Sequence, residues 1–142
     1  MFIRGRRLRQ NENIRNLVEE TSISVNDLIM PIFLIDGKNK VEKVPSMPGI
    51  HRKTLDKQLE DIKSAIDLGI NAIIIFPAVD EKLKDPLGKE ALNKKGLIPK
   101  SIRAIKKAFP RILIITDVAL DPYNSDGHDG VLQDGEILND KT

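Results

Sequence analysis

Residues 112–130 read ILIITDVALDPYNSDGHDG, an apolar run followed by a polar loop rich in aspartate. The run Ile112–Ile115 is continuously apolar, as strands are when a parallel sheet is covered on both faces, so it predicts a buried strand. Thr116 and Asp117 follow at its carboxyl end, where α/β sheets and barrels place their binding chemistry. The stretch therefore predicts a parallel α/β fold with a functional site at the end of this strand.

The loop after this strand gathers ionisable side chains and glycines, namely Asp121, Asp126, Gly127, His128, Asp129 and Gly130. The two glycines are expected to supply backbone freedom. A lone loop aspartate commonly serves a turn, but clustering at a strand end favours a functional role for Asp117, Asp121 and Asp129. A calcium-binding EF-hand is excluded, because its first ligand position would fall on Pro122 or Ser125.

Two further residues of the loop have competing interpretations. His128 is either a pH-responsive lid residue or a structural or solvated histidine. Tyr123 either contacts a substrate or packs beneath the loop. The sequence leaves both alternatives open.

Upstream of this loop, apolar segments alternate between strand and helix patterns. Strands are predicted at Ile32–Ile35 and Asn71–Phe76, and helices at about 55–68 and 99–109. The helices place apolar side chains on one face at Leu55, Leu59, Ile62 and Ile66, and at Ile98, Ile102, Ile105 and Phe109. Two such helices between three strands predict a parallel sheet with right-handed crossovers.

Shorter signals mark the boundaries of these elements. Gly69 is expected to end the first helix, and Ser24 with Asp27 has the spacing of a capping box, which predicts a single helical turn. The segment Pro45–Gly49 contains two prolines and a glycine, so an irregular loop is expected there.

The third strand is not followed by a helix pattern, and three apolar parallel strands would leave two exposed edges. The sequence therefore looks truncated.

Composition favours one intracellular, soluble domain. The 142 residues carry 23 Lys and Arg against 21 Asp and Glu, so no general attraction to nucleic acid or membranes is expected. The lack of cysteine excludes disulfides and thiolate metal sites. The longest apolar run, Ala72–Val79, is too short to span a bilayer, and MFIRGRRLR lacks the apolar core of a secretory signal.

Several segments in a fixed order carry a family resemblance: RGRRLR, LIMPIFL, PSMPGIHR, NAIIIFP, KDPLGKEALN, GLIPKSIRAIK and TDVALDPYNSDGHDG. Together they resemble porphobilinogen synthase, also called 5-aminolevulinate dehydratase. The resemblance implies the first three βα units of an incomplete (β/α)8 TIM barrel, with an N-terminal arm at 1–25 and the barrel portion at 26–142. It also implies condensation of two 5-aminolevulinate molecules to porphobilinogen, a step towards haem and chlorophyll.

The resemblance places the two Schiff-base lysines of the family beyond Thr142, so no catalytic residue is expected within this chain. Lys94 and Lys95 are expected to be solvated. The implied active-site vicinity comprises Asp117, Asp121, Tyr123, Ser125 and Asp129, with a lid beginning at Gly127, His128 and Gly130. Because the Schiff-base lysines are expected beyond Thr142, residues 1–142 are expected to be inactive by themselves.

The resemblance also implies which metal ion this family member uses. Zinc-dependent members carry cysteines at the positions of Ala119, Asp121 and Asp129, whereas carboxylate oxygens prefer hard cations such as magnesium. The chain thus resembles the aspartate-rich branch, which implies magnesium and makes a zinc requirement unexpected. Asp121 and Asp129 either bind metal directly or only hydrogen-bond the substrate.

Basic residues crowd the N-terminal arm, at Arg4, Arg6, Arg7, Arg9 and Arg15. They form a subunit-docking arm, a phosphate-binding arm or a solvated tail. The resemblance favours docking in a homo-octamer. No nucleic-acid or membrane partner is expected. The expected location is the cytoplasm or, for a plant or algal source, the plastid.

Two rival functions remain. One is a non-catalytic truncated paralogue that acts only in assembly. The other is a magnesium-dependent phosphoryl-transfer protein, which the lack of a glycine-rich phosphate loop disfavours.

Overall fold

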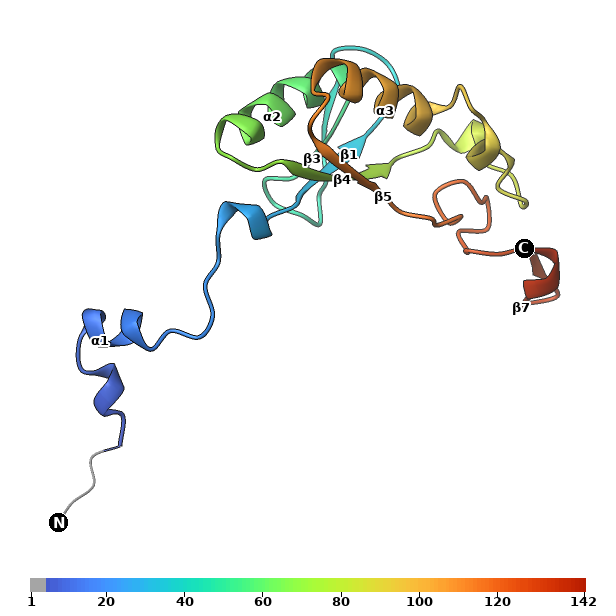
Figure 1. Cartoon of the computed structure of the whole chain (residues 1–142). Coiled ribbons are helices and arrows are strands. Elements are labelled where there is room, and N and C mark those ends of the chain that lie inside the picture. The colour runs from blue at the N-terminus through green and yellow to red at the C-terminus, as the bar shows by residue number, and fades with distance from the viewer. Residues whose placement is uncertain (1–4) are drawn as a thin grey trace.

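The computed structural model describes residues 5–142, and its centre is a five-stranded sheet in the order β2-β3-β1-β4-β5. Three of these strands, β1 (Met30–Leu34), β4 (Ala72–Pro77) and β5 (Leu113–Thr116), pair in parallel. Helices α2 (Leu55–Asp67) and α3 (Leu97–Ala108) connect them and cover one face of the sheet (Figure 1). The predicted alternation of parallel strands and crossover helices is confirmed.

The hydrophobic core lies between this sheet and the two helices. Ile32 and Leu34 alternate along β1, so both point to the same face, because successive side chains of a strand point to opposite faces. The buried members of the core are Ile32, Leu34, Ile62, Ile73, Ile75, Ile105 and Ile112. Burying each of these side chains contributes about 1.5–3 kcal/mol, so this layer is the main source of stability.

Helix α2 ends as the sequence predicts. Gly69 adopts a φ of 91°, and the amides of Gly69 and Ile70 donate to the carbonyls of Ile66 and Ala65, each at 2.9 Å. This Schellman arrangement satisfies carbonyls that have no partner within the helix, and it requires the left-handed conformation that glycine adopts without strain.

Strand β1 begins two residues earlier than predicted and includes Pro31. Proline lacks the amide donor that a central strand needs. It is tolerated here because β3 reaches β1 only at Phe33 and Leu34, so Pro31 pairs with β4 alone.

The prediction that the strand at Ile112–Ile115 is buried on both faces is wrong, because β5 is partly exposed. Its first residue, Leu113, is 58% exposed, and Thr116 is exposed as well. The reason is position, because β5 forms the outer edge of the sheet in the described part of the chain. An apolar sequence predicts a strand, but burial depends on neighbours that a single segment cannot supply.

A hairpin that the sequence did not predict covers the opposite edge. Strands β2 (Val41–Lys43) and β3 (His51–Lys53) pair antiparallel around the irregular segment Pro45–Gly49, and β3 pairs in parallel with β1. Both strands have only three residues and are largely charged, so no apolar alternation marks them. The edge of β1 is therefore covered by this hairpin, and within the described residues the outer strands of the sheet are β2 and β5.

The loops at the carboxyl ends of β4 and β5 carry short elements. After β4 come two 3₁₀ turns, η3 (Glu81–Leu83) and η4 (Lys89–Leu92). After β5 comes a two-stranded hairpin of β6 (Leu132–Gln133) and β7 (Glu136–Ile137), followed by η5 (Asn139–Lys141). These loops lie together at one end of the sheet (Figure 1).

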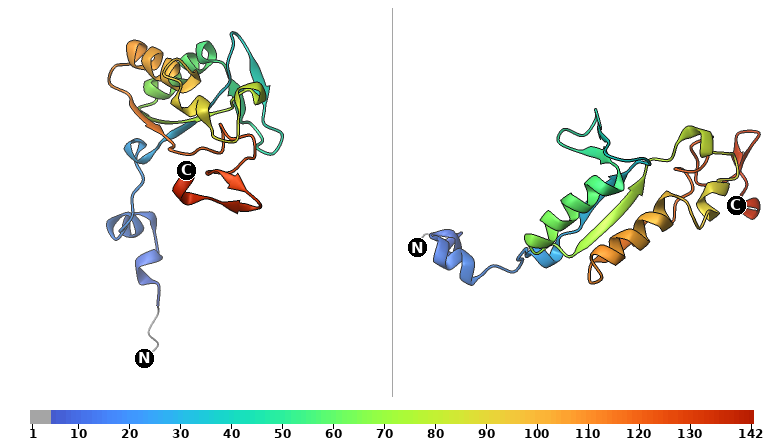
Figure 2. Two further views of the ribbon diagram at one scale, coloured as in Figure 1. Left: turned by 90° about the vertical axis from the view of Figure 1, so that its right-hand side faces the viewer. Right: turned by 90° about the horizontal axis from the view of Figure 1, so that it is seen from above.

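The N-terminal segment holds η1 (Arg7–Arg9), α1 (Glu12–Leu17) and η2 (Val25–Asp27). The first two lie away from the sheet in all views (Figures 1 and 2), whereas the side chain of Val25 in η2 lies beside Gly69. The predicted capping box is present, because the carboxylate of Asp27 accepts a hydrogen bond from the Ser24 amide at 2.7 Å. That hydrogen bond lowers the pKa of Asp27. Arg4 lies outside the described residues.

A polypeptide of residues 1–142 made alone is expected to aggregate. The open edge of β5 offers unpaired backbone groups beside exposed apolar side chains, including Leu113 and the 99% exposed Val118. Light scattering combined with thermal unfolding checks this. A monomeric sample with one sharp, cooperative transition would contradict it.

Among residues 5–142, no helix has the length and apolar character needed to cross a bilayer.

Candidate functional site

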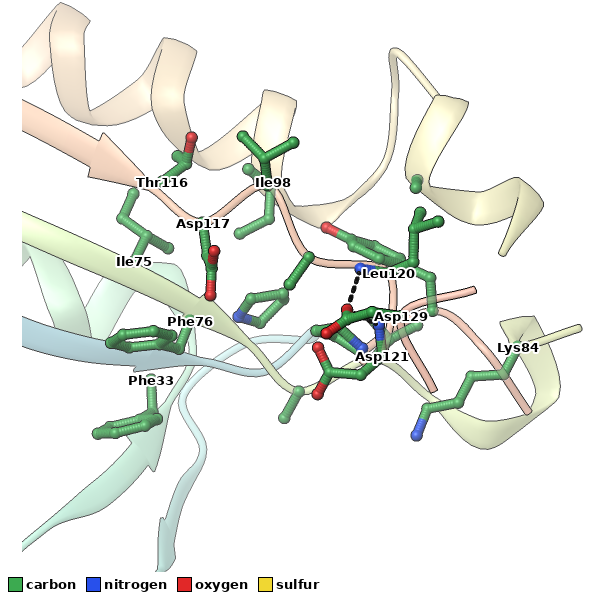
Figure 3. Close-up of a pocket in the computed structure, with 18 of the residues that line it drawn as sticks. Phe33, Ile75, Phe76, Lys84, Ile98, Thr116, Asp117, Leu120, Asp121 and Asp129 are labelled. Carbon is green, nitrogen blue, oxygen red and sulfur yellow. Dashed lines mark hydrogen bonds between the residues drawn. The ribbon is translucent and has the colours of Figure 1, made fainter. Parts of the chain in front are cut away.

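A cavity of about 1140 Å³ opens at the carboxyl ends of the parallel strands, as the sequence predicts for a site. Phe33 of β1 and Phe76 of β4 are register partners, and their rings stack with centroids 5.4 Å apart. Both line the cavity, as does Thr116 at the end of β5 (Figure 3). The strands thus provide a rigid, partly aromatic wall, and the loops that follow them provide the polar groups.

The carboxylate of Asp129 organises the loop after β5. Its Oδ1 accepts hydrogen bonds from the amides of Leu120, at 2.8 Å, and Asp121, at 3.0 Å. The hydrogen bond from the Asp121 amide lowers the pKa of Asp129 most, and that from the Leu120 amide adds to the effect, because both favour the charged form of the carboxylate. A fixed negative charge therefore lies at the cavity wall (Figure 3).

Asp121 has the opposite electrostatic character. Although the residue is exposed overall, partial burial of its carboxyl raises its pKa, and the negative charges of Asp129 and Asp117 add to this effect. The three carboxyl groups all line the cavity (Figure 3). Because they repel one another, a cation or an ammonium group placed between them would be stabilised.

Two basic side chains also line the cavity. Arg52 comes from β3, and Lys84 follows η3. Lys84 is largely buried and forms a 2.7 Å ion pair with Glu81. The cavity therefore offers carboxylates for a cationic group and two cations for an anionic group.

The structure brings together four of the predicted site residues: Asp117, Asp121, Tyr123 and Asp129 line the cavity. Tyr123 is half-buried, and burial, with the negative charge of Glu90, raises its pKa. Ser125 and His128 are exposed and are not part of the lining.

The two glycines of this loop, Gly127 and Gly130, have different roles. Gly127 adopts a φ of 71°, which confirms the expected need for backbone freedom. Gly130 has no such conformation, so the expectation of backbone freedom is wrong there. It is needed for space, because a Cβ would lie 2.6 Å from Cγ2 of Ile137 and 2.8 Å from Oγ1 of Thr142.

Comparison with known proteins decides the family. The family described as "Delta-aminolevulinic acid dehydratase" matches residues 2–142. The chain belongs to this family.

Individual relatives of the delta-aminolevulinic acid dehydratase family agree with this assignment. The chain is 48% identical to the enzyme of that name from Bradyrhizobium diazoefficiens, covering all of this chain and 40% of that protein. It is 45% identical to the chloroplastic enzyme of Hordeum vulgare, covering all of this chain and 33% of that protein. The chain thus spans about 40% or less of these relatives.

A solved structure of the family extends the agreement to three dimensions. It is the delta-aminolevulinic acid dehydratase (porphobilinogen synthase) of Toxoplasma gondii ME49 in complex with the reaction product porphobilinogen. The two structures align with a TM-score of 0.94 at 42% identity, over all of this chain and 41% of that one. The expected fold class, the first part of a TIM barrel, is confirmed.

The possible metal donors in the loop are carboxylates. Within residues 5–142, no group of three or more His, Asp or Glu side chains is placed to hold a metal ion. Asp121 and Asp129 offer hard oxygen donors and Ala119 offers none; one or two carboxylates are the donors through which proteins commonly hold a largely hydrated Mg²⁺. A tetrahedral thiolate site for zinc does not fit these residues.

Sequence reasoning missed three residues at or beside the cavity. Arg52 lies in the unpredicted hairpin, and Lys84 lies in the long connection after β4, where no local pattern marks it. Asn124, in the same loop as Asp129, is 2% exposed. An asparagine between Tyr123 and Ser125 reads as an ordinary turn residue, so nothing in the sequence marked it as buried.

Proposed function

We propose that this chain is the N-terminal part of a porphobilinogen synthase, which joins two molecules of 5-aminolevulinate with loss of two water molecules. The observation that supports this best is the convergence of Asp117, Asp121 and Asp129 on one cavity at the carboxyl ends of the strands. The substrate carries an ammonium group, a ketone and a carboxylate. The cavity holds carboxylates that complement the first and cations that complement the last.

The residues of this chain would bind and orient the substrate. Asp129, held in its charged form by two backbone amides, is suited to fix a substrate ammonium or a Mg²⁺ ion. Asp121, whose pKa is raised by partial burial and by the negative charges of Asp129 and Asp117, is suited to accept a hydrogen bond from the substrate ammonium group. Bound Mg²⁺ would supply positive charge. The lysines that activate the ketones as iminium groups are expected elsewhere in the complete gene product.

Metal dependence tests this function. After a chelator has removed divalent cations, porphobilinogen formation by the complete gene product is expected to return with Mg²⁺ and not to require Zn²⁺, because the loop offers only oxygen donors. Substituting Ala119, Asp121 and Asp129 together by cysteine is the matched variant, and it should bind zinc. Recovery of the unmodified enzyme with zinc alone would overturn the assignment to a hard cation.

We also propose that the N-terminal arm docks on another subunit. Its turns η1 and α1 lie away from the sheet (Figure 2), and the arm exposes apolar side chains, with Leu17 at 85% and Ile23 at 81%. Its arginines are suited to bidentate pairing with carboxylates. Exposure of both kinds of side chain on one extended segment favours a protein partner over a solvated tail.

Deleting residues 1–10 from the complete gene product is expected to reduce the size of the oligomer while leaving the barrel folded. Residues 5–10, the described part of the deleted segment, contribute no residue to the hydrophobic core. Light scattering measures the size, and far-UV circular dichroism of the same sample reports the fold. Unchanged size and unchanged activity would show that the arm is a solvated tail.

Relatives from plants and from the alga Chlamydomonas reinhardtii are named chloroplastic. We propose a cytoplasmic location for a bacterial source and a plastid location for a plant or algal one.

A further inference from the structure

Asn124 is a buried amide among exposed and half-buried loop residues. Its side chain is 2% exposed, and within residues 120–129 it is the buried one. Burying an amide without partners is costly. Here Nδ2 donates to the carbonyls of Gly130, at 3.1 Å, and Pro86, at 3.3 Å, while Oδ1 accepts from the Asp126 amide at 2.6 Å. The burial is therefore compensated by three hydrogen bonds.

Two of these hydrogen bonds lie within the loop after β5, and the third reaches a segment that is distant in sequence. The bond to Asp126 shapes the turn that leads into Gly127. The bond to Gly130 fixes the backbone next to Asp129. The bond to Pro86 reaches the loop after β4, 38 residues away in sequence.

Backbone hydrogen bonds strengthen the same junction. The Asp85 amide donates to the Tyr123 carbonyl at 3.3 Å, and the Ser125 amide donates to the Asp85 carbonyl at 3.2 Å. The two loops are therefore joined on both sides of Asn124. This junction therefore ties the loop that presents Asp129 to the loop after β4.

We propose that Asn124 is a positioning residue that clamps the loop after β5 to the loop after β4 and so holds Asp129 against the Leu120 and Asp121 amides. Those two hydrogen bonds span eight and nine residues. Such a closure is entropically costly unless the intervening chain is fixed. Asn124 fixes the chain between Leu120 and Asp129 near its middle and, through the hydrogen bond to Gly130, at its end. The consequence for catalysis rests on the proposed function, whereas the consequence for the loop does not.

The test compares three variants of the complete gene product. Asn124→Ala removes all three hydrogen bonds. Asn124→Ser keeps a short acceptor for the Asp126 amide, as serine does in turns, but cannot reach both carbonyls. Gln58→Ala is the matched control, because Gln58 is also 2% exposed and its Nε2 donates to a carbonyl, that of Phe33, but it lies on α2 outside the loop.

Hydrogen–deuterium exchange of the peptide spanning 117–130 is the first readout. Asn124→Ala is expected to speed exchange at the Leu120 and Asp121 amides at least about tenfold, with Asn124→Ser between it and the native protein. Gln58→Ala should lower the melting temperature while leaving exchange in this peptide unchanged. Equal exchange in Asn124→Ala and Gln58→Ala would overturn the proposal. If Asn124→Ala does not fold, exchange in Asn124→Ser equal to that of the native protein would overturn it instead.

Steady-state kinetics give the second readout. Asn124→Ala is expected to lower kcat/KM for 5-aminolevulinate by about tenfold or more, partly restored in Asn124→Ser, because a misplaced carboxylate binds the substrate poorly. Normal kinetics despite faster exchange would overturn the positioning role. Faster exchange in a gene product whose native form makes no porphobilinogen would support the clamp and overturn the proposed function.

Discussion

A polypeptide of residues 1–142 made alone is expected to form no porphobilinogen from 5-aminolevulinate. The lysine that lines its cavity, Lys84, is held in an ion pair with Glu81 at 2.7 Å. Lys94 and Lys95 are exposed, as the sequence predicts. Asp117, Asp121 and Asp129 in the cavity lining are exposed, so water reaches the site. An iminium mechanism needs an available amine in a protected site.

The measurement is a colorimetric pyrrole assay of purified 1–142 beside the complete gene product at equal molar concentration. The complete gene product should be active, and 1–142 should not rise above the blank. Pyrrole formation by 1–142 would show that the reacting groups lie within this chain, and it would contradict the division of the site proposed above.

Replacing Asp129 by asparagine in the complete gene product is expected to lower kcat/KM by about 10- to 100-fold, since a charge-assisted hydrogen bond to the substrate or metal is lost. Asparagine keeps a carbonyl oxygen in the position of Oδ1. The amides of Leu120 and Asp121 therefore retain their acceptor, and the loop should keep its shape. Asp129→Ala removes both functions and should cost more.

Asp126→Asn is the matched control, because Asp126 is an exposed carboxylate in the same loop and is not part of the cavity lining. It should leave kcat/KM unchanged. If Asp126→Asn and Asp129→Asn behaved alike, the charge of the loop as a whole would matter, and the specific role of Asp129 would be wrong.

The helices and the parallel strands could be predicted from sequence because each carries its own signal. Apolar residues recur on one face of α2 and α3, and Gly69 marks the end of α2. The hairpin of β2 and β3 carries no such signal, since pairing between main chains holds its short, charged strands. Exposure of β5 could not be predicted either, because it depends on which neighbour lies beside the strand.

The site shows the same limit. Asp117, Asp121 and Asp129 could be predicted because they lie in the loop that begins where a strand ends, and the carboxyl ends of parallel strands meet at one edge. Arg52 and Asn124 could not, because the hairpin brings the first to the cavity and loop packing buries the second. Local sequence predicts residues placed by their own strand and misses those placed by tertiary contacts.

A crystal structure of the complete gene product with 5-aminolevulinate bound tests most directly whether this loop serves the reaction. The account predicts that the ligand nitrogen, or a Mg²⁺ ion beside it, lies within hydrogen-bonding or coordination distance of Asp121 and Asp129, which is about 2–3 Å. A ligand bound with its nitrogen remote from both carboxylates, and no cation between them, would contradict it.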